Sequence, residues 1–355
     1  MFIQLAMTGL LVALLPLSII FFSAEQNKYR KLVTVTMVLT FELIMFGAFT
    51  RLTDSGLGCP DWPGCYGQAN PLQSHEAISA AEVAMPHGPV TLTKAWIEMV
   101  HRYLAMSVGV LIIVQLFFAW TQRSKLPGAL KLAGVLLFAV CLQGAFGAWT
   151  VTLKLQPVIV TTHLLLGIIL LALLAASVEQ QRPAKEARGA GTLIAPATVA
   201  LLVIFIQIAL GGWVSTNYAA LACHDYPLCN GKWLPDMDMG HGFSLWRPLG
   251  QTRDGMYLPF TALVAIQWVH RSFAVLVLGL VAWVGWKALA VKGFEQLGKY
   301  ILMMILLQFL IGVSTVYFSW PLLLAVLHNG GAAMLVLLLT MLNYRVRHVS
   351  RAVVH

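Results

Sequence analysis

The chain has 355 residues, of which 59% are hydrophobic and only 10% are charged, and its formal net charge is +9. A soluble domain carries about 25% charged residues, so this composition excludes a water-soluble protein. Apolar runs of roughly 20 residues can cross a bilayer, where helices satisfy every backbone polar group internally. Nine such runs predict nine transmembrane helices, at about residues 4–22, 33–50, 98–120, 128–150, 159–178, 192–214, 260–286, 300–319 and 322–343.

The basic residues are concentrated in every second segment between these helices. If the spans alternate in direction, fifteen of the 23 Lys and Arg fall on one side of the membrane. They are Lys28, Arg30, Lys31, Arg123, Lys125, Lys131, Arg182, Lys185, Arg188, Lys287, Lys292, Lys299, Arg345, Arg347 and Arg351. An excess of Lys and Arg marks the cytoplasmic side. We therefore expect a cytoplasmic C-terminus, long loops on the outer side, and no nucleic-acid partner.

The first span stands apart from the others. No positive charge precedes it in Met1–Gln4, which argues against a signal peptide. Cleavage after this span would also export the basic cluster that follows it, against the charge rule. We therefore expect an uncleaved extra transmembrane helix that forms, with its cytoplasmic link, a separate segment of residues 1–30. The N-terminus is then expected on the outer side.

The remaining eight spans form an internal repeat. The segment Gly47–Gly67 recurs as Gly211–Gly231 at an offset of 164 residues, with both cysteines matched. Further matches pair Val100-His101-Arg102 with Val269-His270-Arg271, Gln143 with Gln308, and His163 with His328. Four spans per repeat make the two copies parallel. The sequence thus predicts an all-α membrane protein with two tandem four-helix bundles, residues 31–185 and 186–355, related by a parallel pseudo-twofold axis.

Four of the five cysteines lie in the two long loops of the repeat. Cys59 and Cys65 follow the second span, and Cys223 and Cys229 follow the sixth. Both loops are expected on the oxidising outer side, where disulfides persist. A metal site is the alternative, although zinc sites favour closer cysteine spacing. Cys141 lies alone inside a span and is interpreted as a small buried hydrophobic residue.

Four histidines lie inside predicted spans, two in each half of the repeat. They are His101, His163, His270 and His328, each in about the first third of a helix that runs inward from the outer side. Polar side chains in a membrane usually face the bundle interior. Two neutral imidazoles that face each other across a bundle are the ligands of six-coordinate heme iron. The alternatives are hydrogen-bonded structural histidines and a zinc or copper site.

An arginine directly follows the first histidine of each half. Arg102 and Arg271 point away from the neighbouring imidazole, towards the outer interface. At that depth a guanidinium can pair with a heme propionate through two hydrogen bonds. Simple extension of the side chain to the lipid headgroups is the alternative. Arg51, at the outer end of the second span, is a weaker candidate for the same role.

The two halves differ at one acidic position. Glu98 lies three residues before His101 on the same helix face, and the matching residue in the second half is Gln267. A carboxylate beside a heme can take up or release protons and stabilise positive charge. A salt bridge to Arg102 is the alternative. Glu42, interpreted as a second buried acid in the second span, is excluded from the catalytic set.

Two segments resemble a known family. The segment Thr50–Gly67, with the sequence Thr-Arg-Leu-Thr-Asp-Ser-Gly-Leu-Gly-Cys-Pro-Asp-Trp-Pro-Gly-Cys-Tyr-Gly, resembles the first outer loop of heme A synthases. Glu98-Met-Val-His101-Arg102 is similar to that family's Glu-x-x-His-Arg element. The resemblance covers the second to the ninth span. The extra N-terminal helix departs from the family pattern, which has eight spans and an N-terminus inside.

The resemblance implies an enzyme that converts heme O to heme A for terminal oxidases. The methyl group at C8 of the porphyrin would be oxidised to a formyl group by successive hydroxylations. A heme b cofactor would be held by His270 and His328, while His101 and His163 would flank the substrate heme. Glu98 would be the essential acid at the reacting methyl group.

The resemblance also implies the cysteine pairing and the cellular setting. Cys59 would form a disulfide with Cys65, and Cys223 with Cys229, in a multi-pass protein of the bacterial cytoplasmic membrane. Heme O synthase and an electron acceptor are candidate membrane partners, and an oligomer is compatible with the sequence. Two other functions stay open at this point. They are a di-heme cytochrome that passes electrons from quinol, and a carrier that binds heme O without altering it.

Overall fold

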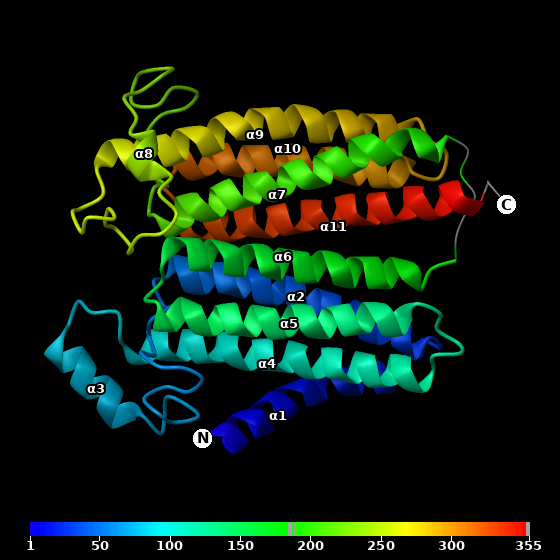
Figure 1. Cartoon of the computed structure of the whole chain (residues 1–355), viewed down its shortest axis with the longest axis horizontal. Helices are drawn as coiled ribbons and strands as arrows, with labels where there is room; N and C mark the ends of the chain where they lie inside the picture. Colours follow the sequence, from blue (N-terminus) through cyan, green and yellow to red (C-terminus); the bar gives the residue numbers. More distant parts are fainter. Residues whose placement is uncertain (184–186, 188, 353–355) are drawn as a thin grey trace. The chain divides into compact units, whose positions relative to one another are not determined.

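The structure, a computed structural model, describes residues 1–183, 187 and 189–352, with side chains as far as residue 349. Lys185 and Arg188 of the basic pattern lie outside the described residues, as does the side chain of Arg351. Within this range, nine helices are long and apolar enough to cross a membrane (Figure 1). They are α1 (Phe2–Phe21), α2 (Lys28–Leu52), α4 (Leu92–Thr121), α5 (Ala129–Thr152), α6 (Pro157–Gln180), α7 (Ile194–Thr216), α9 (Phe260–Leu289), α10 (Glu295–Tyr317) and α11 (Leu322–Ala352). The all-α class and the predicted nine spans are confirmed.

Several helices extend beyond the apolar runs that predicted them. α4 begins at Leu92 rather than near residue 98, because Thr91 caps it by accepting the backbone N–H of Lys94 at 3.2 Å. The extension places Glu98 inside the helix, nearly two turns from its start. The two long loops also contain short helices that the sequence did not predict, α3 (His75–Ala84) and α8 (Met239–Gly242), and a 3₁₀ turn at Ala190–Leu193 precedes α7. Hydrophobic runs locate a membrane crossing better than they locate helix ends.

The chain divides into two compact units, and the division passes through α6. Unit 1 comprises Met1–Leu155 and Ile169–Val178, and unit 2 comprises Gln156–Ile168 and the described residues from Glu179 onward. The predicted halves 31–185 and 186–355 follow the sequence repeat instead and stay a prediction.

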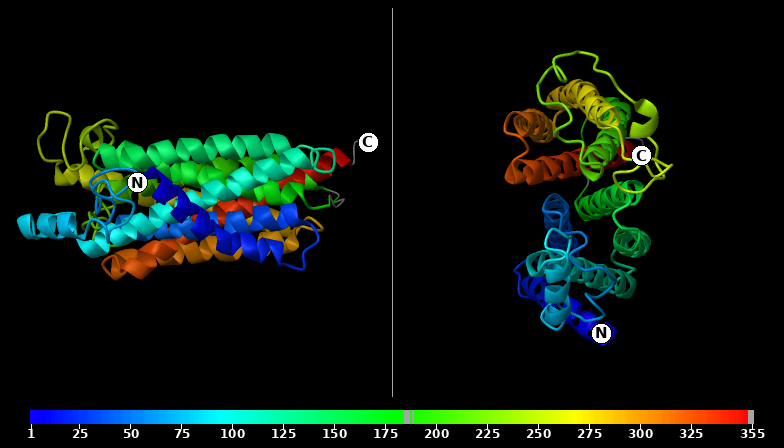
Figure 2. Two further views of the ribbon diagram at one scale, coloured as in Figure 1. Left: turned by 90° about the horizontal axis from the view of Figure 1, so that it is seen from below. Right: turned by 90° about the vertical axis from the view of Figure 1, so that its left-hand side faces the viewer.

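In unit 1, α4 is the central helix. α1, α2 and α5 all pack against α4, and α1 also contacts α2 (Figure 2). Val33 of α2, Ile112 of α4 and Leu136 of α5 are fully buried in one core cluster, which Leu174 of α6 completes. In a membrane, such dense packing between helices replaces the hydrophobic driving force that operates in water.

α1 packs closely on α4 and also reaches the first outer loop. Leu5 is 3% exposed and belongs to the same cluster as Cys59, Cys65 and Met99. One turn further, a side chain at Gly9 would place its Cβ 3.0 Å from the Cβ of Met106, so any larger residue would require the two helices to shift apart by a few tenths of an ångström. α1 is therefore an integral part of unit 1, and its N-terminal end supports the first disulfide loop.

The close approach of α1 to α4 predicts a specific loss of stability. Gly9→Leu should destabilise the detergent-solubilised protein by about 1–3 kcal/mol, because overpacking forces two backbones apart. Ala6→Leu adds the same bulk on an exposed position of the same helix and is the matched control. Thermal unfolding followed by intrinsic fluorescence measures both variants, and equal midpoints for the two would contradict this packing.

In unit 2, four helices form a closed ring. α7 packs against α9, α9 against α10, α10 against α11, and α11 against α7 (Figure 2, where these helices are seen end-on). Near the C-terminal end of α11, Arg345 donates two hydrogen bonds, of 2.7 and 2.9 Å, to the buried carboxylate of Glu179 at the end of α6. Such bidentate pairs are among the stronger polar contacts in proteins.

The two long loops after α2 and α7 share one local structure, which agrees with their sequence repeat. Each contains a disulfide, Cys59–Cys65 in the first loop and Cys223–Cys229 in the second, so the cysteine pairing implied by the resemblance is present. These pairings leave no thiolate in either loop for the alternative metal site. In each loop the side chain of an aspartate also accepts hydrogen bonds from the backbone N–H groups of the two residues that follow the second cysteine.

Asp61 is that aspartate in the first loop. It accepts the N–H groups of Tyr66 and Gly67 at 2.6 and 2.7 Å. Its counterpart Asp225 accepts those of Asn230 and Gly231 at 2.6 and 2.9 Å. These N–H groups, above all that of Gly231, hold the pKa of Asp225 below its usual range.

Candidate functional site

A cavity lies inside the helix ring of unit 2. It is open on one side, and most of its lining is apolar. His270 of α9 and His328 of α11 both line it. Cofactor sites are typically apolar cavities with a few converging polar groups. The structure thus brings the predicted second-half histidines into one cavity.

A glycine on a neighbouring helix makes room for each of these imidazoles. A Cβ at Gly211 of α7 would lie 3.0 Å from Cε1 of His270, and a Cβ at Gly312 of α10 would lie 3.0 Å from Cε1 of His328. In unit 1, a Cβ at Gly47 of α2 would lie 2.9 Å from the imidazole of His101. Any larger residue would push the ring away. Gly47 and Gly211 belong to the sequence repeat, but the sequence did not reveal this role.

Arg271 connects this cavity to the second disulfide loop. One nitrogen, Nη2, donates to the carbonyl groups of Asp225 and Leu228 in that loop. The guanidinium lies over the ring of Tyr226, 5.2 Å from its centroid. The other nitrogen, Nη1, is buried and has no hydrogen-bond partner among the described residues. Arg271 is also one of the residues that line the cavity. A buried, unpaired guanidinium nitrogen is costly unless an anionic group reaches it.

Further cavity residues carry unpaired polar atoms. In the part of the chain that the structure describes, Oε1 of Gln207, Oε1 of Gln267, Oε1 of Gln308 and Nδ1 of His328 are buried without a hydrogen-bond partner. Most buried polar atoms in native proteins are paired, and exceptions often mark a site for a ligand or water. In the sequence, Gln267 and Gln308 are recognisable only as positions of the repeat, and no pattern distinguishes Gln207.

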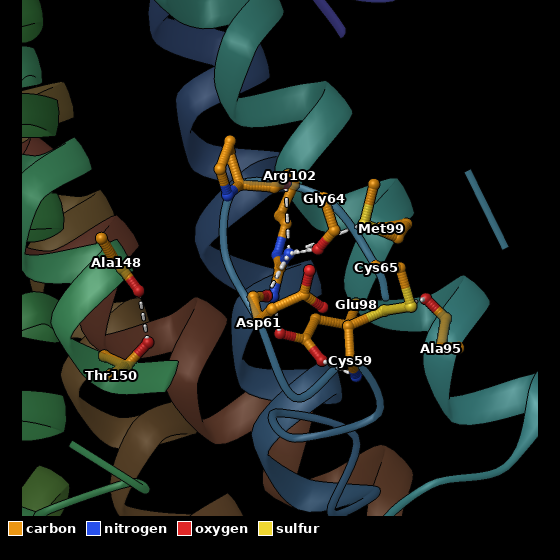
Figure 3. Close-up of polar contacts among 12 residues, drawn as sticks. Cys59, Asp61, Gly64, Cys65, Ala95, Glu98, Met99, Arg102, Ala148 and Thr150 are labelled. Carbon is orange, nitrogen blue, oxygen red and sulfur yellow. Dashed lines mark hydrogen bonds and ion pairs between the residues drawn. A yellow bond between two sulfur atoms is a disulfide. The ribbon is translucent and has the colours of Figure 1, made fainter. Parts of the chain in front are cut away.

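In unit 1, Glu98 and Arg102 form one buried polar cluster beneath the first disulfide loop (Figure 3). Oε1 of Glu98 pairs with Nη2 of Arg102, and Oε2 accepts the backbone N–H of Cys59 at 2.8 Å. The Glu98 side chain is 6% exposed and that of Arg102 is 11% exposed. The salt bridge that was the alternative for Glu98 is therefore formed, and the separate hydrogen bond from Cys59 connects the acid to the disulfide loop.

Arg102 also anchors the loop through its other nitrogen. Nη1 donates to the carbonyl groups of Asp61 and Pro63 at 3.0 and 3.2 Å, and to that of Gly64 (Figure 3). Both arginines of the repeat thus hold loop carbonyls rather than extending to headgroups. They differ in that Arg102 pairs with a carboxylate, whereas Arg271 has one buried nitrogen without a partner among the described residues.

The two first-half histidines belong to different units. His101 of α4 lies in unit 1, where its ring stacks near Phe46 with a centroid distance of 6.3 Å. His163 of α6 lies in the segment Gln156–Ile168, which belongs to unit 2. Their pairing around a second heme stays a prediction. Arg51, the weaker arginine candidate, forms a salt bridge with Asp54 at 3.1 Å.

Two interpretations of buried residues were wrong. Glu42 is exposed on α2, and Cys141 is exposed on α5. Hydrophobicity alone does not distinguish a residue inside a helix bundle from one on its surface, because a surface that faces lipid is also apolar.

Fold and site together define a multi-pass helical membrane protein with a histidine-lined cavity beneath a disulfide loop. The sequence pattern of the COX15-CtaA family, described as cytochrome oxidase assembly protein, matches residues 30–340. The chain belongs to this family. α1 lies before the matched region.

Curated relatives of the chain are heme A synthases. That of Shewanella oneidensis is 39% identical over 323 residues, which cover 90% of this chain and 97% of the relative. That of Caulobacter sp. strain K31 is 30% identical over 340 residues, with 88% and 94% covered. That of Shouchella clausii is 27% identical over 336 residues, with 91% and 97% covered. The family predicted from the loop and Glu-x-x-His-Arg motifs is confirmed.

Proposed function

We infer that this chain is a heme A synthase, an oxidoreductase that converts heme O to heme A. Its membership of the family and its similarity to heme A synthases over most of its length support this function. The reaction that we propose oxidises the C8 methyl group of heme O to a formyl group by successive hydroxylations, and its product serves terminal oxidases. The rival functions, a di-heme cytochrome and a heme carrier, gain no support from these relatives.

The observation that carries the cofactor assignment is the unit 2 cavity. It offers two imidazoles, each with a glycine opposite it, and an unpaired guanidinium nitrogen on Arg271. These groups fit a heme, which needs two axial nitrogens, an apolar slot for the ring and a cation for a propionate. In our proposal His270 and His328 hold the iron of heme b, and Arg271 binds a propionate. When bound, heme b supplies one-electron chemistry.

The first half binds the substrate heme in this proposal. His101 and His163 flank heme O, and Arg102 orients its outer edge. Glu98 acts as the acid at the reacting methyl group, where it accepts or returns a proton. Its bonds to Cys59 and Arg102 support this role, because they fix the carboxylate from the loop side and limit its rotation. Gln267 at the matching position cannot exchange a proton in this way.

The chain's arrangement in the membrane is also part of the proposal. The positive-inside pattern supports a cytoplasmic C-terminus and outer disulfide loops, in the bacterial cytoplasmic membrane. The sequence repeat supports two tandem four-helix bundles joined by a parallel pseudo-twofold axis, with α1 added to the first. Heme O synthase, an electron acceptor and a second copy of the chain are the membrane partners to look for.

The test of this function is whether heme O becomes heme A in the presence of the chain. It requires a host that makes heme O and lacks its own heme A synthase. Extracted hemes separate by chromatography and differ in mass, so product and any hydroxylated intermediate are identified directly.

A further inference from the structure

Gln207 of α7 contacts the imidazole of His270 from inside the unit 2 cavity. Its Nε2 lies 3.1 Å from Nδ1 of His270 and 3.2 Å from the backbone carbonyl oxygen of the same residue. Gln207 lies one helical turn from Gly211, the glycine that makes room for the same ring, so both residues occupy one face of α7. Oε1 of Gln207 is buried and has no partner among the described residues.

A histidine that binds iron through Nε2 carries its proton on Nδ1. This proton needs a hydrogen-bond acceptor, which also fixes the plane of the ring. A flip of the Gln207 amide group about the Cγ–Cδ bond exchanges the positions of Nε2 and Oε1. The unpaired Oε1 then lies next to Nδ1 of His270. The exchange gives up the contact with the His270 carbonyl, which still accepts a helical N–H within α9.

We propose that Gln207 is the positioning residue for His270, and that its amide oxygen accepts the Nδ1 proton when Nε2 binds the iron of heme b. The proposal rests on the function proposed above, in which His270 is an axial ligand. The hydrogen bond makes the imidazole a stronger electron donor. It therefore stabilises oxidised iron and lowers the midpoint potential of heme b.

The first half of the repeat has no glutamine at this position. At the same offset of 164 residues that relates Gly47 to Gly211, the counterpart of Gln207 is Leu43. By contrast, Gln308 is matched by Gln143, and its Nε2 donates to the backbone carbonyl of His328 at 2.9 Å rather than to the ring. The contact with the imidazole at this helix position is thus a feature of the second half alone.

This asymmetry agrees with what each half must do with its heme. A cofactor is retained through many turnovers, so a reinforced ligand is an advantage in the second half. A substrate heme must leave after oxidation, and Leu43 has no polar group that could make the corresponding hydrogen bond. Loss of an outer hydrogen bond to a metal ligand typically weakens binding by about 10–100-fold.

The experiment compares Gln207→Leu and Gln207→Glu in the full-length purified protein. Gln207→Leu introduces the residue of the first half, so the midpoint potential of heme b should rise and heme b affinity should fall by about tenfold or more. Gln207→Glu supplies a stronger acceptor and should shift the potential downward. The g values of the ferric low-spin signal in electron paramagnetic resonance should move with the potential in both variants.

The matched control is Gln115→Leu, which removes another buried glutamine. Gln115 lies on α4 in unit 1, where its Nε2 donates to Thr36 at 2.7 Å, and its loss should leave the heme b potential unchanged. A wild-type potential and wild-type g values in Gln207→Leu would overturn the proposal. If the Gln207→Leu protein does not accumulate, Gln207→Glu provides the test. An unchanged heme b potential in Gln207→Glu would also overturn the proposal.

A separate arm distinguishes this proposal from the function on which it rests. His270→Ala should lose the low-spin heme b signal. If that signal persists in His270→Ala, the heme b site itself is misassigned. If the signal is lost in His270→Ala but Gln207→Leu behaves as wild type, only the role of Gln207 fails.

Discussion

Glu98→Gln is expected to lower heme A formation by about 10²–10⁴-fold, the usual contribution of a general acid or base. Glutamine keeps the shape of the side chain and can still accept the N–H of Cys59, but it cannot exchange a proton. Heme b should remain bound, because Glu98 lies in unit 1 and the cavity lined by His270 lies in unit 2. Chromatography of the extracted hemes measures heme A and heme O, and the reduced spectrum measures heme b.

The salt bridge to Arg102 makes a control necessary. Glu98→Gln leaves a buried guanidinium without its partner, which can loosen the first disulfide loop and lower activity indirectly. Asp61→Asn weakens the same loop, because it replaces one of the two oxygens that accept the N–H groups of Tyr66 and Gly67, and it leaves the Glu98 carboxylate in place. If Asp61→Asn loses as much heme A as Glu98→Gln, Glu98 serves only to hold the loop. A much larger loss in Glu98→Gln supports the proposed acid.

His270→Ala and His328→Ala are each expected to strip heme b from the purified protein. Loss of one bond from a histidine to the heme iron, if it contributes at least about 1.4 kcal/mol, lowers the affinity for heme b at least tenfold. Any heme that remains should change from a six-coordinate low-spin to a five-coordinate high-spin spectrum, because one axial nitrogen is missing. The pyridine hemochrome assay and the visible spectrum measure content and spin state.

His224→Ala is the matched control for these variants. His224 is an exposed residue of the second outer loop, and its loss should leave heme b content at the wild-type level. Full retention of low-spin heme b in His270→Ala and His328→Ala would place the cofactor elsewhere in the chain. Because both residues line one cavity, the two variants should also behave alike.

The sequence predicted most of the fold because membrane helices follow directly from hydrophobic length. Every predicted span corresponds to a helix, and the errors lie at helix ends, as at Leu92, where a polar turn extends the helix past the apolar run. The short helices α3 and α8 were not predicted, since four to ten residues of loop carry too little periodicity. The repeat was readable because cysteines and histidines recur at fixed offsets.

The contacts of the site were less predictable than its residue types. The sequence pointed to Glu98 and Arg102, but not to the bond from Cys59 to Glu98, which depends on how a loop folds over a helix end. Gln207 was missed because a single glutamine in an apolar span has no distinguishing pattern, and its meaning depends on the imidazole beside it. Glu42 and Cys141 were misplaced because apolar surroundings look the same inside a bundle and on its lipid face.

In each unit an arginine links buried polar groups to a disulfide loop. In unit 1, Arg102 joins Glu98 to the loop closed by Cys59 and Cys65. In unit 2, Arg271 joins the cavity to the loop of Asp225. Each arginine binds several loop carbonyl groups at once. A substitution in either loop should therefore also shift the arginine and the buried polar groups next to it.

The most direct test of the proposed function is chemical conversion of heme O. We would co-express the chain with a heme O synthase in a host that makes no heme A, and identify the extracted hemes by chromatography and mass. Heme A, with or without a hydroxylated intermediate, should appear only when this chain is present and should be lost in Glu98→Gln. Unchanged heme O beside a protein that binds heme b tightly would contradict the proposed synthase function and favour an electron-carrying cytochrome or a heme carrier.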